Sequence, residues 1–153
     1  MNDVNKPINL DRMAAQYAQQ IVRLALVKSN GDGDGQPASE RATAVDNTVT
    51  KALGVLQENG IYASGLFLLS RKEDTAAIIM GQMLDLLESI GNEMHFGWAK
   101  KPDPGNPEHV LKYLSDNVVV NLEQLLLTKE TLEQMLIYAR YGAKAANAGR
   151  ANQ

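Results

Sequence analysis

The sequence Asn59-Gly60-Ile61 ends one helix and starts the next, and this constrains the fold more than any other feature of the chain. Upstream of it, apolar side chains recur with helical spacing, at Val45, Val49, Ala52, Leu53 and Leu56. Glycine adopts a positive φ without steric cost and therefore suits the position just past a helix end. A short apolar helix is predicted over residues 62–70, and the basic pair Arg71 and Lys72 follows it. We therefore expect a tight helical corner with cations at its exit.

Helical periodicity extends along most of the 153 residues and predicts an all-α fold, a compact single-domain bundle of about six helices. The expected helices span residues 10–28, 40–58, 62–70, 74–90, 108–126 and 129–147. Residues 1–8 are expected to form a flexible N-terminus, 9–147 the helical domain and 148–153 a frayed tail. The valine run at residues 118–120 is assigned to a helix, because a single strand would have no partner.

Local signals mark the expected helix ends. They are Asn9, Ser39 and Thr128 as N-caps, Pro107 in a first turn and Gly91 as a C-cap. The fifth helix is expected to break, if anywhere, near residues 115–117. Gly54 and Gly65 fall inside helices, where each glycine costs about 1 kcal/mol relative to alanine. Close approach of another helix is the expected reason for both glycines.

Two separate blocks of the sequence share residue types and order with one known family. The first block contains Leu56, Gln57, Asn59, Gly60 and Ile61, and then Gly65, Phe67, Leu68, Ser70 and Lys72. The second reads Leu127-Thr128-Lys129-Glu130-Thr131-Leu132, followed by Tyr138-Ala139-Arg140-Tyr141-Gly142-Ala143-Lys144-Ala145. Together they resemble the small helical subunit of type III-B CRISPR effector complexes, the Cmr complexes. Tyr138 stands where that family commonly has tryptophan, and Arg140-Tyr141 is displaced by one residue.

This resemblance implies a non-catalytic subunit whose copies stack side by side in the minor filament of a Cmr-type effector. The implied partners are the other effector subunits, copies of the chain itself and the guide RNA–target RNA duplex. The subunit would contact the backbone of the target strand in antiviral defence. Target cleavage and signalling would belong to other subunits, so neither catalytic residues nor a cofactor is expected, and the expected location is the cytoplasm.

The charge of the chain limits how it can bind RNA. A net charge of −3 and a pI near 5.4 argue against strong, self-sufficient nucleic-acid binding. Any RNA contact is therefore expected to be a local stripe of cations that follows phosphates without reading bases. If the resemblance holds, the candidate RNA-binding residues are Arg12, Arg41, Lys51, Arg71, Lys72, Arg140 and Lys144. For any single cation, ordinary solvated charge is the simpler interpretation.

Other kinds of site lack support in the sequence. The chain has no cysteine, so disulfides and thiolate metal sites are excluded. Residues 30–35 resemble the start of a calcium-binding EF-hand loop, but Arg41 occupies position 12, where that loop needs a glutamate. We therefore expect a flexible polar loop there. His95 and His109 also lack the spacing of metal ligands, so no bound metal is expected. No apolar run approaches the roughly 18 residues of a membrane span, so no membrane partner is expected.

A second functional class stays open at this point. This class is a helical protein–protein adaptor or self-assembling module without an RNA role, which the acidic pI and the absence of a basic tail favour. An enzyme is the least supported class, because no nucleophile–base pair or phosphate-binding loop can be assembled from the sequence.

Overall fold

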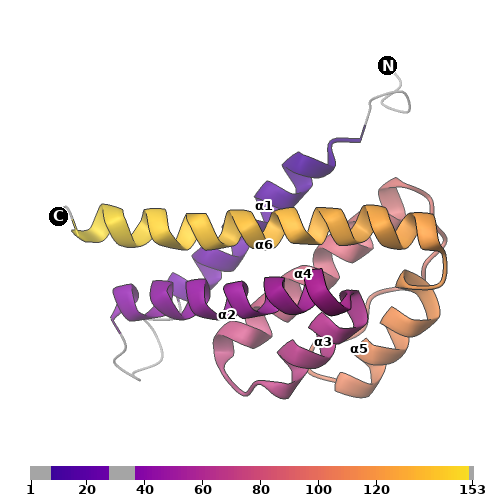
Figure 1. Cartoon of the computed structure of the whole chain (residues 1–153), viewed down its shortest axis with the longest axis horizontal. Coiled ribbons are helices and arrows are strands. Elements are labelled where there is room, and N and C mark those ends of the chain that lie inside the picture. Colours follow the sequence, from indigo (N-terminus) through magenta and orange to yellow (C-terminus); the bar gives the residue numbers. More distant parts are fainter. Residues whose placement is uncertain (1–7, 28–36, 152–153) are drawn as a thin grey trace.

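The structure, a computed structural model, describes residues 8–27 and 37–151, and this part of the chain folds mainly into helices (Figure 1). In these ranges there are six α-helices, one π-helical segment and no strand. They are α1 (Leu10–Val27), α2 (Ala38–Asn59), α3 (Ile61–Ser70), α4 (Asp74–Glu93), α5 (Pro107–Tyr113), the π-helix η3 (Leu114–Val118) and α6 (Leu122–Ala151). The predicted all-α class is confirmed. The predictions made for residues 1–7 and for the loop at 30–35 fall outside the described residues.

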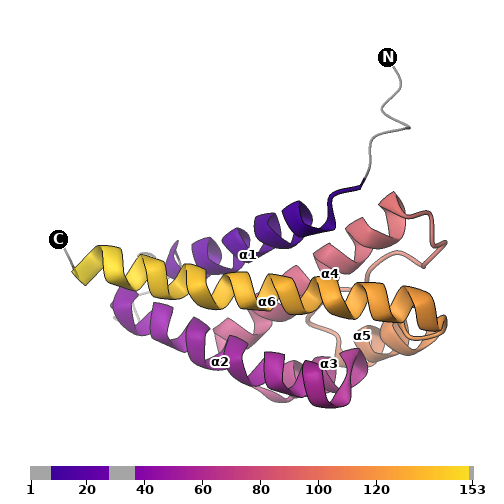
Figure 2. The same ribbon diagram turned by 45° about the horizontal axis from the view of Figure 1, so that its top comes forward.

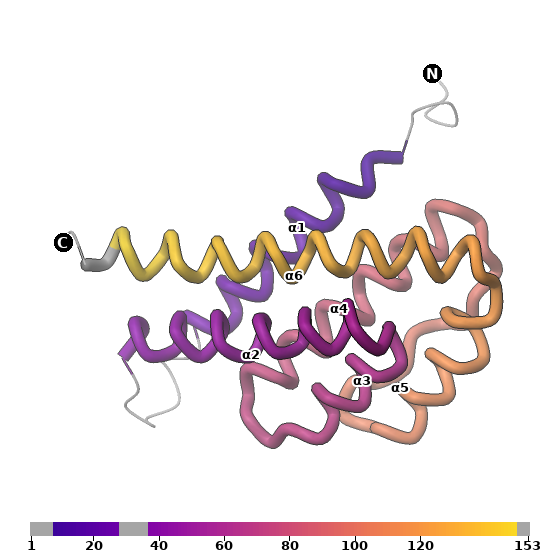
Figure 3. The backbone as a smooth tube through the Cα atoms, viewed as in Figure 1, coloured from indigo at the N-terminus to yellow at the C-terminus, as the bar shows by residue number. Residues whose placement is uncertain are grey.

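The longest helix, α6, organises the bundle. It has 30 residues and packs against both α1 and α2. It runs antiparallel to α2 and crosses α1, as Figures 1 and 2 show from two directions. The tube in Figure 3 shows how the chain doubles back from α2 through α3 into α4, and then reaches α5 by a long connection. Residues distant in sequence therefore meet along α6.

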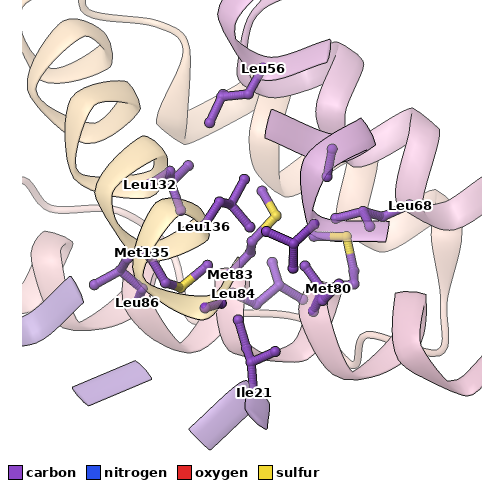
Figure 4. Packing of buried hydrophobic residues seen from close by; sticks show 14 of the residues in the cluster. Ile21, Leu56, Leu68, Met80, Met83, Leu84, Leu86, Leu132, Met135 and Leu136 are labelled. Carbon is purple, nitrogen blue, oxygen red and sulfur yellow. The ribbon is translucent and has the colours of Figure 1, made fainter. Parts of the chain in front are cut away.

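Buried aliphatic and methionine side chains from most of the helices form one core (Figure 4). Its largest fully buried members include Ile21, Leu56, Leu68, Met80, Met83, Leu84 and Leu86. From α6, Leu132, Met135 and Leu136 enter the same cluster. Each such side chain contributes roughly 1.5–3 kcal/mol by leaving water. The core faces of the helices follow the periodicity from which they were predicted.

The predicted corner between α2 and α3 is confirmed. Gly60 has a φ of 95°, and its N–H donates to the carbonyl of Leu56 at 3.0 Å, which closes the last turn of α2. The carbonyl of Gly60 accepts from the N–H of Ser64 at 3.1 Å, which opens α3. Ile61, the first residue of α3, is 1 % exposed, so the corner is anchored in the core.

Of the three predicted caps at the ends of α1, α2 and α4, the structure confirms one. Asn9 caps α1, because its Oδ1 accepts from the N–H of Arg12 at 2.9 Å. Ser39 is not a cap: α2 begins at Ala38, two residues before the predicted start, and Pro37 occupies the N-cap position. Gly91 is not a C-cap either, since α4 continues to Glu93.

Gly91 and His95 explain how α4 actually ends. A Cβ on Gly91 would lie 2.8 Å from Cε3 of Trp98, so this glycine makes room for the indole ring. The left-handed residue is His95, with a φ of 56°. The N–H of Phe96 then donates to the carbonyl of Gly91 at 2.9 Å, as in a Schellman motif. The glycine that resembled a cap therefore serves side-chain packing.

The segment between α5 and α6 differs most from the prediction. Residues 108–126 do not form one helix: α5 ends at Tyr113, the π-helix follows, and Val119 and Val120 lie in the break. Asn121 then starts α6, because its Oδ1 accepts from the N–H of Gln124 at 3.0 Å. Thr128, the predicted cap, is fully buried inside α6. The same helix runs past residue 147 to Ala151, into the segment that was expected to fray.

Tyr113 makes the stability of the fold depend on pH in the alkaline range. Its hydroxyl is buried and has no hydrogen-bond partner among the described residues. Burial, with a smaller effect of the Glu88 charge, raises the pKa of Tyr113 to about 12. An unfolded tyrosine has a pKa near 10. Between these values the unfolded state loses a proton that the folded state keeps, so the free energy of unfolding falls as pH rises.

We therefore expect Tyr113→Phe to raise the free energy of unfolding at pH 7 by about 1 kcal/mol, because it removes an unpaired buried hydroxyl. The same variant is expected to lose less stability than the parent between pH 9 and pH 11. Urea unfolding of both chains at pH 7, 9 and 11 measures both effects. A Phe variant less stable than the parent at pH 7 would show that the hydroxyl makes a stabilising contact.

Candidate nucleic-acid interface

Two of the candidate cations meet at the seam between α6 and α2. Nε of Arg140 lies 3.3 Å from Oδ1 of Asp46, and Nζ of Lys144 lies 3.4 Å from Oδ2 of the same carboxylate. The two cations are one turn apart on α6, as their spacing predicted. Their side chains remain 37 % and 48 % exposed. Because two cations share one carboxylate, the cluster keeps a net positive charge on the surface.

A second group of cations lies near the exit of α3. Arg71 pairs with Glu73, with 3.0 Å between Nη2 and Oε1, and its guanidinium lies 5.4 Å from the ring centre of Phe67. The pKa of the Glu73 carboxyl is lowered, first by a hydrogen bond from its own backbone N–H and then by the hydrogen bond from Arg71. The charge of Lys51 on α2 contributes least to this lowering. Lys72 is exposed beside them.

An exposed ridge of α2 lies between these two groups. Small or neutral residues recur along it with helical spacing: Thr43, Asn47 and Thr50 are exposed, and Gly54 is half-buried. Asp46 and Lys51 flank the ridge, since five residues correspond to about 140° around a helix. The hydroxyls of Thr43 and Thr50 donate to the backbone carbonyls of Ser39 and Asp46. The side chains of these threonines are therefore turned back onto the helix and protrude little from it. We define the α2 face as Thr43, Asn47, Thr50 and Gly54 together with the cations Lys51, Arg140 and Lys144.

Gly54 is the residue of the α2 face that internal packing does not explain. A Cβ added to Gly54 would have no atom within 4 Å, so the predicted close approach of another helix is wrong here. The same prediction is confirmed for Gly65, whose added Cβ would lie 2.7 Å from Cδ1 of Leu114. A glycine inside a helix costs about 1 kcal/mol relative to alanine. Glycine also permits close approach by the backbone of another molecule, and this use fits an outward-facing position.

Arg41 and Arg12 lie away from the α2 face. Arg41 is only 5 % exposed, and its Nε donates to the carbonyl of Ala25, which connects the start of α2 to the end of α1. This burial makes Arg41 a structural residue and removes it from the candidate phosphate contacts. Arg12 is exposed on the N-terminal part of α1. Figures 1 and 2 place that part of α1 on the opposite side of α6 from α2, so Arg12 does not join the other cations.

The sequence analysis did not identify Asp46, whose carboxylate forms ion pairs with both Arg140 and Lys144. It also missed the low ridge, although the spacing of Thr43, Asn47, Thr50 and Gly54 was visible in the sequence. Within residues 8–27 and 37–151, His, Asp and Glu side chains form no group of three or more arranged to hold a metal ion. None of the helices in the same ranges combines the length and apolar character needed to cross a membrane.

Comparison of the chain with protein-family models, with curated proteins and with solved structures finds no match. The resemblance to the Cmr small subunits therefore stays a prediction that rests on the two sequence blocks.

Proposed function

We propose that this chain is a non-catalytic small subunit of a cytoplasmic type III-B CRISPR effector, and that its α2 face contacts the backbone of the target RNA. In this role, copies of the chain stack in the minor filament along the guide RNA–target RNA duplex. The observation that carries the proposal is the uncharged surface of α2, which includes Gly54, a glycine that contacts within the protein do not explain. Cations lie on both sides of this surface. Cations and small polar groups bind phosphates and sugars without base specificity, which suits a subunit that must accept any target sequence.

The acidic balance of the chain fits this role if binding is shared among copies. With about three or four phosphate contacts per copy, the affinity of one chain should fall with salt at a log–log slope of about −2 to −3. A single copy would therefore bind weakly near physiological salt. Several copies held in one complex raise the effective concentration of each site, so an array can bind tightly although each member is weak.

One observation is consistent with the adaptor function, which is the second candidate. Three large apolar side chains are exposed near the start of α6: Val120 at 69 %, Leu122 at 67 % and Leu126 at 57 %. Exposed apolar patches of this kind often mark protein–protein contacts. Such a patch serves a subunit that contacts effector proteins, and it serves an adaptor with no RNA partner equally well.

Substitution of Gly54 separates the two functions. We expect a tagged chain with Gly54→Trp, purified from its host with its partners, to retain about tenfold less RNA than the parent. The reason is that the indole would occupy the space through which the RNA backbone approaches. The readout is sequencing and quantification of the co-purified RNA, with mass spectrometry of the bound proteins.

Gly81→Trp is the matched control, because Gly81 lies on α4 and an added Cβ would likewise meet nothing within 4 Å. Parent and Gly81→Trp should recover short RNAs with a shared 5′ repeat tag together with other effector subunits. Recovery of protein partners without RNA from the parent chain would reject the RNA function and support the adaptor. Equal RNA recovery from the Gly54 and Gly81 variants would reject the α2 face as the contact surface.

A further inference from the structure

A pocket beside α5 gathers cations that do not belong to the α2 face. It has a volume of about 350 Å³ and lies between the connection after α4 and the segment formed by α5 and the π-helix. The connection contributes Lys100 and Pro102, and α5 contributes His109 and Lys112. Asp116 of the π-helix completes the polar part of the wall. The pocket is therefore lined by two lysines, one histidine and one carboxylate from three adjoining segments.

The lysines of this pocket, Lys100 and Lys112, form no ion pair with another side chain of the described residues. Their neighbour Lys101 behaves differently, since its ammonium pairs with Asp85 and its backbone N–H donates to Glu88 at 3.1 Å. Lys101 thus fixes the connection to α4, while Lys100 keeps its charge for the pocket.

The walls of the pocket are joined to each other by Asn117. Its Oδ1 accepts from the N–H of Ala99 at 3.0 Å, and its Nδ2 donates to the carbonyl of Tyr113 at 3.1 Å. The second bond satisfies a carbonyl at the start of the π-helix. A π-helical segment is rarer than a continuous α-helix and occurs frequently at functional sites. The two walls are therefore held in place before any ligand arrives, which reduces the entropy lost on binding.

We propose that this pocket binds the phosphate group of a ribonucleotide. Lys100 and Lys112 supply cations from opposite walls, and His109 adds a ring N–H donor. The carboxylate of Asp116 is suited to accept a hydrogen bond from a sugar hydroxyl. The apolar part of the wall, including Pro102 and Tyr113, suits the sugar or base. A volume near the lower limit of small-molecule sites fits one nucleotide.

The test uses the full chain labelled with ¹⁵N and titrated with adenosine 5′-monophosphate, inorganic phosphate or adenosine. We expect amide shifts confined to residues 99–102 and 109–117 with the monophosphate, smaller shifts there with phosphate, and none with adenosine. The Lys100→Gln/Lys112→Gln variant should weaken monophosphate binding by at least about tenfold for each charge removed. Lys129→Gln is the control, because Lys129 lies on α6 and pairs with Glu133 at 3.6 Å.

Two outcomes would overturn this proposal: equal shifts with adenosine, or phosphate-induced shifts spread over lysines throughout the chain. Binding of a single-stranded RNA by the same variants identifies the source of the phosphate. If the double lysine variant loses monophosphate binding alone, the ligand is a free nucleotide; if it also loses RNA binding, the ligand is a phosphate of the RNA chain. The residues tested here are separate from the α2 face, so failure of one proposal leaves the other standing.

Discussion

The triple variant Lys51→Gln/Arg140→Gln/Lys144→Gln is expected to bind target RNA about a hundredfold more weakly than the parent in the assembled complex near physiological salt. Each lost phosphate contact should also reduce the log–log salt slope by about one per copy. The fold should be affected little, since the ion pairs of Arg140 and Lys144 with Asp46 are partly exposed and surface pairs of this kind contribute about 0–1 kcal/mol each. Filter binding at several salt concentrations, with thermal unfolding of the isolated chain, measures both quantities.

Two further variants make this result specific. Arg12→Gln removes one exposed cation from α1, away from the α2 face, and should leave both affinity and salt slope unchanged. Asp46→Asn removes the carboxylate that competes with phosphate for Arg140 and Lys144, and should raise affinity about two- to threefold. Equal weakening by Arg12→Gln and by the triple variant would show that overall charge, not the α2 face, governs binding.

Gly65→Val is expected to cause the largest loss of stability among single substitutions at glycine, about 2–3 kcal/mol in the free energy of unfolding. Even a Cβ at Gly65 would lie 2.7 Å from Cδ1 of Leu114, and Leu114 is fully buried, so its side chain has no open space into which to turn. Urea unfolding followed by circular dichroism measures the loss.

A double substitution tests whether this single contact is the cause. Leu114→Ala alone should cost about 2–5 kcal/mol by leaving a cavity. In the Gly65→Val/Leu114→Ala chain, the valine partly fills that cavity, so the combined loss should be clearly smaller than the sum of the two. Strict additivity would mean that the strain of Gly65→Val arises elsewhere. Gly81→Ala, on an open helix surface, should instead stabilise the chain by about 1 kcal/mol.

Much of the fold could be predicted from sequence because helical periodicity reports burial directly. The corner at Gly60 was predictable because one residue there both ends α2 and precedes α3. The errors arose where one residue type serves two purposes. Gly91 resembled a cap but makes room for Trp98, and Thr128 resembled a cap but faces the core. Helix-end signals alone do not distinguish these uses, because the distinction depends on residues far away in sequence.

The candidate interface was only partly predictable for the same reason. Arg140 and Lys144 could be placed on one helix face, but Asp46 approaches Arg140 across 94 positions of the sequence. The sequence does carry a signal for the burial of Arg41, which is 5 % exposed. Its spacing from Val45 and Ala52 places it on the buried face of α2, and periodicity should have outweighed its charge.

The order of the helices along the chain has a consequence for how the protein is made. Both α1 and α2 pack along α6, which the ribosome synthesises after them. Until Leu132, Met135 and Leu136 emerge, the apolar faces of the earlier helices lack the surface that completes the core. A nascent chain halted before α6 would therefore expose those faces to water and to other nascent chains. Quality control during translation has a clear signal to recognise, because the core of this bundle is complete only after α6 has been made.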